Sequence, residues 1–143
     1  MSMCKRFHFF AFLASMTLLV SATSIAAQDR SGTYKWTYKN VAVGVLKIRE
    51  TGTGSRRRIT FTLRVEQSNY PCVGEIDGRL KVVSSNLYEY NPNRPFRDAN
   101  GGLNYCRLTF AFSGKQVVVR ENDCEDFHGA RCNFEGKYVK SGH

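Results

Sequence analysis

The chain has 143 residues, with 21 Lys and Arg against 12 Asp and Glu, so its formal net charge is +9. A surplus of this size disfavours cationic partners and favours anionic ones, such as phosphate-bearing lipids, nucleic acid or acidic polysaccharide. The apolar run nearest to spanning length, residues 7–20, has 14 residues. Because a bilayer requires roughly 20, composition argues against a transmembrane anchor.

The beginning of the chain has the order of a secretory signal peptide. Two basic residues precede the apolar run 7–20, and small residues then lead to a cleavage position after Ala26 or Ala27, the second slightly favoured. We therefore predict a signal peptide over 1–27 and a single domain over 28–143 without a transmembrane segment. The protein is expected to be secreted, with the bacterial periplasm as its compartment. Without the two basic residues of the leader, the net charge is +7.

Four cysteines follow the leader: Cys72, Cys106, Cys124 and Cys132. An even number in an exported chain predicts two disulfides, which would stabilise a domain of 116 residues whose core is of modest size. Three pairings are possible. We favour Cys124 with Cys132, closing a tight loop, and Cys72 with Cys106, joining two strands.

Apolar and polar residues alternate with a period of two along most of the domain. The clearest case places Ile59, Phe61, Leu63 and Val65 on one side, which predicts a half-buried strand over 58–66. The same pattern predicts strands over 33–38, 41–50, 103–112, 116–121 and 132–140. Two less certain strands lie between Cys72 and Tyr90, where Asp77-Gly78 is either a hairpin turn or a bulge in one longer strand.

Short turns between these runs indicate an antiparallel meander. Seven or eight strands in one domain must close into a barrel or stack as a sandwich. We predict an all-β fold, a small antiparallel up-and-down β-barrel with a lipocalin-like meander. The first and last strands each carry a Gly-x-Tyr step, at 32–34 and 136–138, as suits strands that meet to close the ring. A β-sandwich is the alternative.

Templates for catalysis mostly fail. After the leader the only histidines are His128 and His143, and disulfide-bonded cysteines leave no thiolate for zinc or for nucleophilic attack. We therefore predict no metal site, no cofactor and no enzymatic activity. Glu125 and Asp126 form an acidic cluster near His128, and these three residues define the alternative of a small hydrolase; we favour a solvated loop.

Basic residues give the candidate binding sites. Three arginines follow a Gly-rich turn, two flank an aromatic residue in the long loop 91–102, and a histidine and an arginine lie in the disulfide loop. Guanidinium groups match the geometry of phosphate and carboxylate, although charges at turns often serve only to solvate them. The candidate binding residues are Arg56, Arg57, Arg58, Arg94, Phe96, Arg97, His128 and Arg131.

Tyr34, Trp36 and Tyr38 share one face of the first strand. Such a set could stack against single-stranded nucleic acid. We favour a core-facing stripe with Trp36 closing the barrel floor, and do not expect a nucleic-acid partner.

Three segments carry a resemblance: 106–114 (CRLTFAFSG), 116–121 (QVVVRE), and 124–138, which runs from Cys124 through Cys132 to Gly136-Lys-Tyr138. They resemble the small exported bacterial β-barrel proteins that include the periplasmic lysozyme inhibitors. The Ser-Gly-x-x-Tyr type of loop through which the C-type lysozyme inhibitors act has no counterpart here, so no inhibitory residue is carried over. A basic domain would also be repelled by the strongly basic C-type lysozymes.

These observations favour a non-catalytic exported binding module of the bacterial envelope. It would recognise an anionic envelope component or a protein through loops at one end of the barrel. An inhibitor or immunity protein against a cell-wall hydrolase or an exported toxin is the second hypothesis. The oligomeric state is left open.

Overall fold

The computed structural model describes residues 29–68, 72–92, 96–97, 101–129 and 131–142, so the predicted signal peptide lies outside the described residues. Eight antiparallel strands close into a barrel, which confirms the predicted fold over the sandwich. The elements are β1 (Gly32–Tyr38), β2 (Ala42–Thr51), the 3-10 helix η1 (Gly54–Arg56), β3 (Arg58–Gln67), β4 (Cys72–Val82), β5 (Leu87–Tyr90), β6 (Phe96–Arg97), β7 (Leu103–Asn104), β8 (Arg107–Ser113), β9 (Gln116–Asn122), α1 (Glu125–His128) and β10 (Gly136–Lys140).

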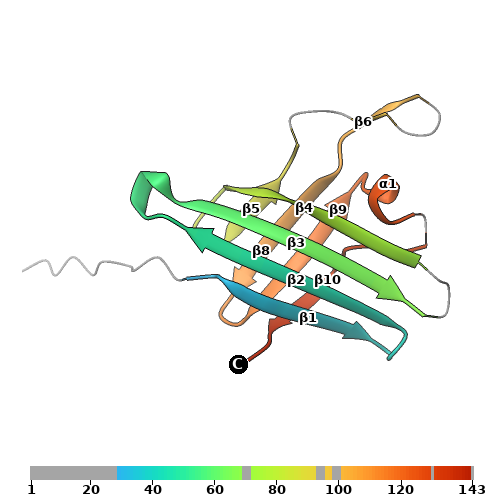
Figure 1. Cartoon of the computed structure of the whole chain (residues 1–143), viewed down its shortest axis with the longest axis horizontal. Coiled ribbons are helices and arrows are strands. Elements are labelled where there is room, and N and C mark those ends of the chain that lie inside the picture. The colour runs from blue at the N-terminus through green and yellow to red at the C-terminus, as the bar shows by residue number, and fades with distance from the viewer. Residues whose placement is uncertain (1–28, 69–71, 93–95, 98–100, 130, 143) are drawn as a thin grey trace, which may run out of the picture.

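The barrel is an up-and-down meander. Going round it from β1, the order is β2, β3, β4, β5, β8, β9 and β10, and the ring closes because β10 pairs with β1. Tyr34 lies opposite Lys140 and Lys35 opposite Val139, so the two strands with a Gly-x-Tyr step meet as predicted. The short strands β6 and β7 pair with each other outside the barrel (Figure 1).

The barrel interior is filled by the side chains that the period-two pattern assigns to one face. On β2 and β3 they include Leu46, Ile48, Phe61 and Leu63, none more than 5% exposed. Aromatic rings pack at the centre, where the ring centroids of Phe61 and Phe110 are 5.0 Å apart. Burial of this apolar set is the main source of stability. The surfaces on which a ligand can bind are therefore the outer face and the two ends.

β4 is one strand where the sequence left two possibilities open. Its register with β3 continues without interruption from Cys72 to Leu80, so the predicted turn or bulge at Asp77-Gly78 is wrong. The alternative of one longer strand is confirmed, and β5 is the second strand predicted before Tyr90. Gly78 instead makes room for the ring of Tyr90, with which a side chain at this position would collide.

Two predicted strands are shorter in the structure. The run 103–112 is divided between β7 and β8, and the run 132–140 contributes to the sheet only from Gly136. Before Gly136, the backbone N–H of Phe134 donates to the carboxylate of Glu121 at 2.6 Å. The Glu121 carboxylate thus accepts a backbone hydrogen bond that the carbonyl group of a neighbouring strand would otherwise accept. The four-residue helix α1, which has no periodic signal in the sequence, precedes this segment.

Two disulfides form as predicted, but the favoured pairing is wrong: Cys72 pairs with Cys132, and Cys106 with Cys124. Cys106 precedes β8 and Cys124 follows β9, so the pairing of these strands brings their Cα atoms to 4.3 Å. Cys132 follows α1, which packs against β4, the strand that begins at Cys72. We call Cys72–Cys132 the β4 bridge and Cys106–Cys124 the β8–β9 bridge.

The barrel has two ends with different closures. The η1 end carries the β2–β3 turn, and the buried guanidinium of Arg30 closes it, 4.9 Å from the ring centroid of Tyr88 and 5.2 Å from that of Phe112. The α1 end carries α1 and both bridges. Figure 1 shows η1 and α1 on opposite sides of the molecule.

Candidate ligand-binding surfaces

The three arginines of the predicted tip lie at the η1 end and have two roles. Arg57 is partly buried, and its Nε forms an ion pair with the carboxylate of Glu50. The hydrogen bond to Glu50 raises the pKa of Arg57, although partial burial opposes the shift. Arg56 and Arg58 are exposed. Two of the three guanidinium groups thus face solvent, and Arg57 supports the turn.

The other predicted binding residues that the structure describes belong to the opposite half of the molecule. His128 and Arg131 lie at the α1 end, and Arg131 is exposed. Phe96 and Arg97 form β6, whose backbone pairs with β7. Arg94 lies outside the described residues. The structure therefore does not bring the predicted residues that it describes into one site.

His128 is a buried helix residue, so its prediction as a loop residue is wrong. It ends α1 and is 5% exposed. Its Nδ1 lies 2.6 Å from the carbonyl oxygen of Gly129, and its Nε2 lies 2.9 Å from Oε1 of Glu121. Its ring meets that of Phe134 edge-on, with 4.8 Å between centroids. Both ring nitrogens are therefore engaged inside the protein.

The surroundings of His128 favour its protonated form. Burial lowers its pKa, but the hydrogen bonds to Glu121 and Gly129 and the negative charges of Glu121 and Glu125 outweigh burial, so the pKa is raised. A carbonyl oxygen only accepts, so Nδ1 carries a proton, and the imidazolium then donates from Nε2 to Glu121. This pair ties α1 to β9 and has a structural role.

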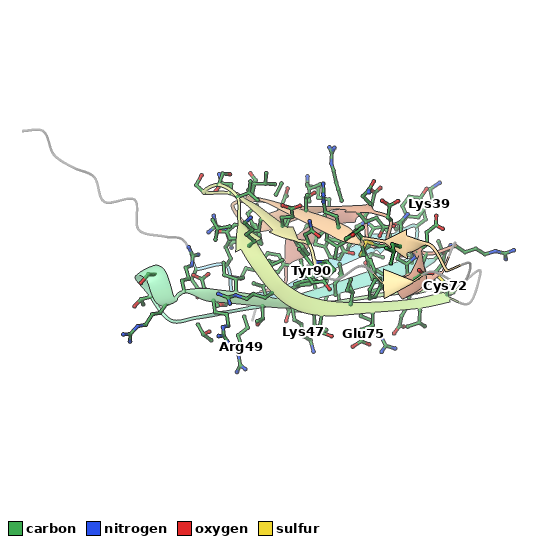
Figure 2. All side chains as sticks on the ribbon, turned by 90° about the horizontal axis from the view of Figure 1, so that it is seen from above. Lys39, Lys47, Arg49, Cys72, Glu75 and Tyr90 are labelled. Atoms are coloured by element: carbon green, nitrogen blue, oxygen red, sulfur yellow. A yellow bond between two sulfur atoms is a disulfide. The ribbon has the colours of Figure 1, made fainter. Side chains whose placement is uncertain are left out.

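Basic side chains form a patch on the outer face of β2, β3 and β4. The register places Arg49 opposite Thr60, and Thr60 opposite Arg79, so the two arginines flank one threonine at roughly 10 Å, two strand spacings. Figure 2 shows Lys47 and Arg49 directed away from the barrel on the same side. We call the following exposed residues the basic face: Lys47, Arg49, Arg56, Arg58 and Arg79.

Two carboxylates on this outer face lie toward the α1 end and pair with Arg64, and a third, Asp77, lies in the row of Lys47 and Thr62. Nε of Arg64 lies 2.7 Å from Oε1 of Glu66, and its Nη1 lies 3.4 Å from Oε2 of Glu75. Figure 2 shows Glu75 on the same side as Lys47 and Arg49 but farther along the sheet. Within the described part of the chain, no residue of the basic face forms an ion pair. The exposed carboxylate of Asp77 lies in the next row, opposite Thr62, so the field of the basic face is positive but partly compensated.

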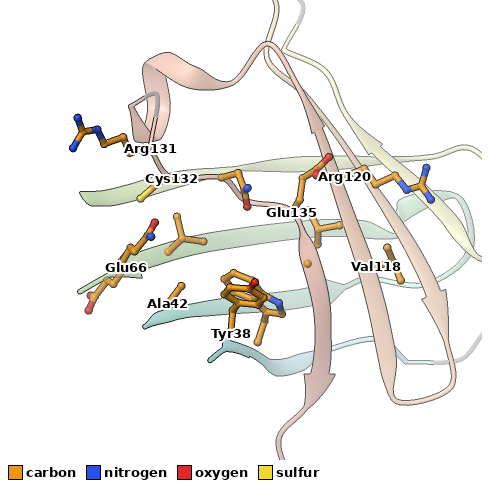
Figure 3. Close-up of a pocket in the computed structure, with 14 residues that line it drawn as sticks. Tyr38, Ala42, Glu66, Val118, Arg120, Arg131, Cys132 and Glu135 are labelled. Carbon is orange, nitrogen blue, oxygen red and sulfur yellow. The ribbon is translucent and has the colours of Figure 1, made fainter. Parts of the chain in front are cut away.

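A pocket of about 730 Å³ lies at the α1 end, beside the strands that close the barrel (Figure 3). One wall consists of Trp36 and Tyr38, whose rings are nearly parallel, 15° apart in plane with centroids 6.3 Å apart. The floor is apolar and buried, and is formed by Ala42, Val65, Val119 and Cys132. We call this the seam pocket.

The seam pocket forms where β1 and β10 separate. The two strands pair only at Tyr34 and Lys35. Farther toward the α1 end, the indole of Trp36 lies over Gly136, where a Cβ would come within 2.9 Å of the indole. The indole also packs against Tyr138, at 6.1 Å between ring centroids. Glycine at position 136 therefore allows the indole to fill the gap between the strands.

The aromatic stripe of β1 passes from the core to the surface. Tyr34 is 1% exposed, Trp36 is half-buried, and Tyr38 is 50% exposed. The predicted core-facing stripe is therefore confirmed for Tyr34 and wrong for Tyr38. The strand extends past the point at which β10 covers it, so its last aromatic side chains face the pocket.

Neither surface was identified from the sequence. Arg49 and Arg79 occupy polar positions of alternating strands, but their alignment across Thr60 depends on the strand register, which alternation does not define. The sequence did contain a signal for the seam pocket: three aromatic residues share one face of β1, and not all of them are buried in the core. The pairing of β10 with β1 is needed to show which of these aromatic side chains remain outside the core.

Comparison with protein-family models, with curated proteins and with solved structures gives no match for this chain. None of the helices in the described residues has the length and apolar character to cross a membrane. Those residues also contain no group of three or more His, Cys, Asp or Glu side chains placed to hold a metal ion.

Proposed function

We propose that this protein is an exported, non-catalytic binding module that holds a phosphate-bearing anionic component of the bacterial envelope on its basic face. The observation that carries the proposal is the row Arg49–Thr60–Arg79, which presents two unpaired guanidinium groups on either side of a hydroxyl. Guanidinium groups donate in a planar fork that matches phosphate oxygens. Lys47, Arg56 and Arg58 extend the positive surface around this row.

The rigidity of the surface supports this proposal. The row crosses three long paired strands, within two or three residues of their ends at the η1 end. Its side chains start from paired backbone positions, so little backbone entropy is lost on binding. Two disulfides suit an oxidising compartment, and the leader-like first 27 residues suit export. The sequence analysis expected binding through loops at one end of the barrel, whereas this proposal places binding on the outer face of the sheet.

The test is binding of the oxidised protein to inorganic polyphosphate over a series of salt concentrations. Because binding releases counterions, affinity should fall steeply as salt rises. The variant Arg49→Gln/Arg79→Gln should bind less tightly and lower the slope of log K against log salt by about 1.5. The matched control is Lys115→Gln/Lys137→Gln, which removes two exposed charges elsewhere on the barrel and should leave most of the affinity.

Two results would overturn the proposal. Equal losses in the two double variants would mean that net charge alone is responsible. Tight binding to an envelope protein that does not weaken with salt, together with no binding to polyphosphate, would favour the inhibitor or immunity role.

A further inference from the structure

The seam pocket has the form of a site for a small ligand rather than of a gap in packing. Its volume of about 730 Å³ lies within the range of roughly 300–1,000 Å³ that is usual for ligand sites. It combines an apolar floor, an aromatic wall and a polar margin. Sites that hold small molecules typically have this composition.

The polar margin offers both donors and acceptors and no net charge. Two side-chain amides, Gln67 and Asn133, line the pocket, and each amide can donate and accept, as a hydroxyl group can. The charged lining residues are Glu66, Glu135, Arg120 and Arg131, two of each sign. Figure 3 shows Arg120 and Arg131 extending outward on opposite sides of the pocket. The pocket therefore does not share the anionic preference of the basic face.

The aromatic wall favours a ligand with a flat apolar face. The rings of Trp36 and Tyr38 lie nearly parallel, 15° apart, and Tyr38 is 50% exposed. The C–H groups on one face of a pyranose ring pack well against such rings, while its hydroxyl groups bond to polar groups at the edge. A ligand with both features matches the wall and the margin together.

An added peptide strand fits the seam less well. Strand addition needs an accessible backbone edge, and β1 does extend beyond its pairing with β10. However, the indole of Trp36 occupies the space next to Gly136 and blocks the approach of a backbone between the two strands. The side-chain wall, and not the strand edge, is the surface offered.

We propose that the seam pocket is a saccharide-binding site in which Tyr38, whose ring is stacked with that of Trp36, packs against a pyranose ring, and Gln67 and Asn133 bind its hydroxyl groups. The site lies at the α1 end and includes no residue of the basic face. It is thus independent of the proposed polyanion binding, and each can fail without the other.

Trp36 is the single tryptophan of the chain, so its fluorescence reports directly on the pocket. Titration with chitotriose, cellotriose and maltotriose should shift or quench the emission with at least one sugar, at a Kd on the order of millimolar or tighter. Free muramyl dipeptide and its isolated dipeptide serve as further probes. No change with any sugar, or a change with the isolated dipeptide alone, would overturn the proposal, the second result favouring a peptide ligand.

The matched variants are Tyr38→Ala and Tyr105→Ala, because these tyrosines are 50% and 49% exposed and only Tyr38 lines the pocket. Tyr38→Ala should weaken sugar binding about tenfold, with unchanged thermal unfolding, and Tyr105→Ala should not weaken it. The variant Arg49→Gln/Arg79→Gln should keep full sugar affinity. Equal losses in both tyrosine variants would overturn the assignment to the seam pocket.

Discussion

Replacing Glu121 by alanine removes the acceptor that holds the α1 end together. One carboxylate oxygen accepts from the backbone N–H of Phe134 at 2.6 Å, and the other lies 2.9 Å from Nε2 of His128. Both partners are buried, at 0% and 5% exposure. Breaking a buried ion pair from one side costs about 3–5 kcal/mol, and because Glu121 keeps 14% exposure of its side chain we expect the lower value, about 3 kcal/mol.

Urea denaturation followed by circular dichroism measures this loss. With an m value of about 1.5 kcal/mol per M, the midpoint should fall by about 2 M. The control is Asp126→Ala, an exposed carboxylate in α1, whose effect should stay within about 0.5 kcal/mol. If Glu121→Ala destabilises the protein no more than this control, the structural role assigned to the pair is wrong.

The same pair predicts a dependence on pH. The folded-state pKa of His128 is raised from 6.5, so its contribution to stability is complete below that value and is lost as the pH rises through the raised pKa. Stability should therefore decline on the alkaline side of pH 6.5. In Glu121→Gln the amide can still accept from Phe134 and donate to a neutral imidazole. This variant should be more stable than Glu121→Ala and should show a flatter pH profile; an unchanged profile would refute the linkage.

The bridges and the packing of α1 give the remaining predictions. Replacing both cysteines of a bridge by serine should lower the free energy of unfolding by about 3 kcal/mol for the β8–β9 bridge and about 4 kcal/mol for the β4 bridge, because the bridges join residues 18 and 60 apart. Denaturation curves measure which loss is larger, and a peptide map without reduction checks the pairing. Gly74→Ala should cost about 2 kcal/mol by pushing α1 off β4, since its Cβ would collide with His128. Gly142→Ala, which meets nothing within 4 Å, is its control, and equal unfolding midpoints would contradict the contact.

The sequence predicted what depends on local pattern. Alternation located β1, β2, β3 and β9 closely, and the paired Gly-x-Tyr steps anticipated the closure of the barrel. The partner of Cys106 depends on the register of the predicted β8–β9 hairpin, which places Cys106 and Cys124 at its open end. The partner of Cys72 could not be obtained from local pattern, because the packing of α1 against β4 that brings Cys132 to it is a tertiary feature. Where alternation gives only a face, the register decides which side chains become neighbours.

The candidate sites follow the same division. The arginines of the tip were visible as a run, yet Arg57 turns inward to Glu50, and the neighbours of Arg58 come from other strands. His128 had the residue type of a site but the environment of a core, because Glu121 reaches it from the end of β9. Residue type suggested chemistry in each case, and burial determined whether a ligand could reach it.

The closure of the ring by β10 has a consequence for the order of assembly. β1 pairs with β10, the last strand of the described residues. Just after β10, the hydroxyl of Ser141 donates to the carbonyl oxygen of Thr33 at 2.9 Å, across 108 positions of sequence. During synthesis, which proceeds from the amino terminus, one edge of β1 stays uncovered until β10 emerges. Contacts of such long range slow folding, and the seam pocket, which residues of both strands line, can form only after β10 has reached β1.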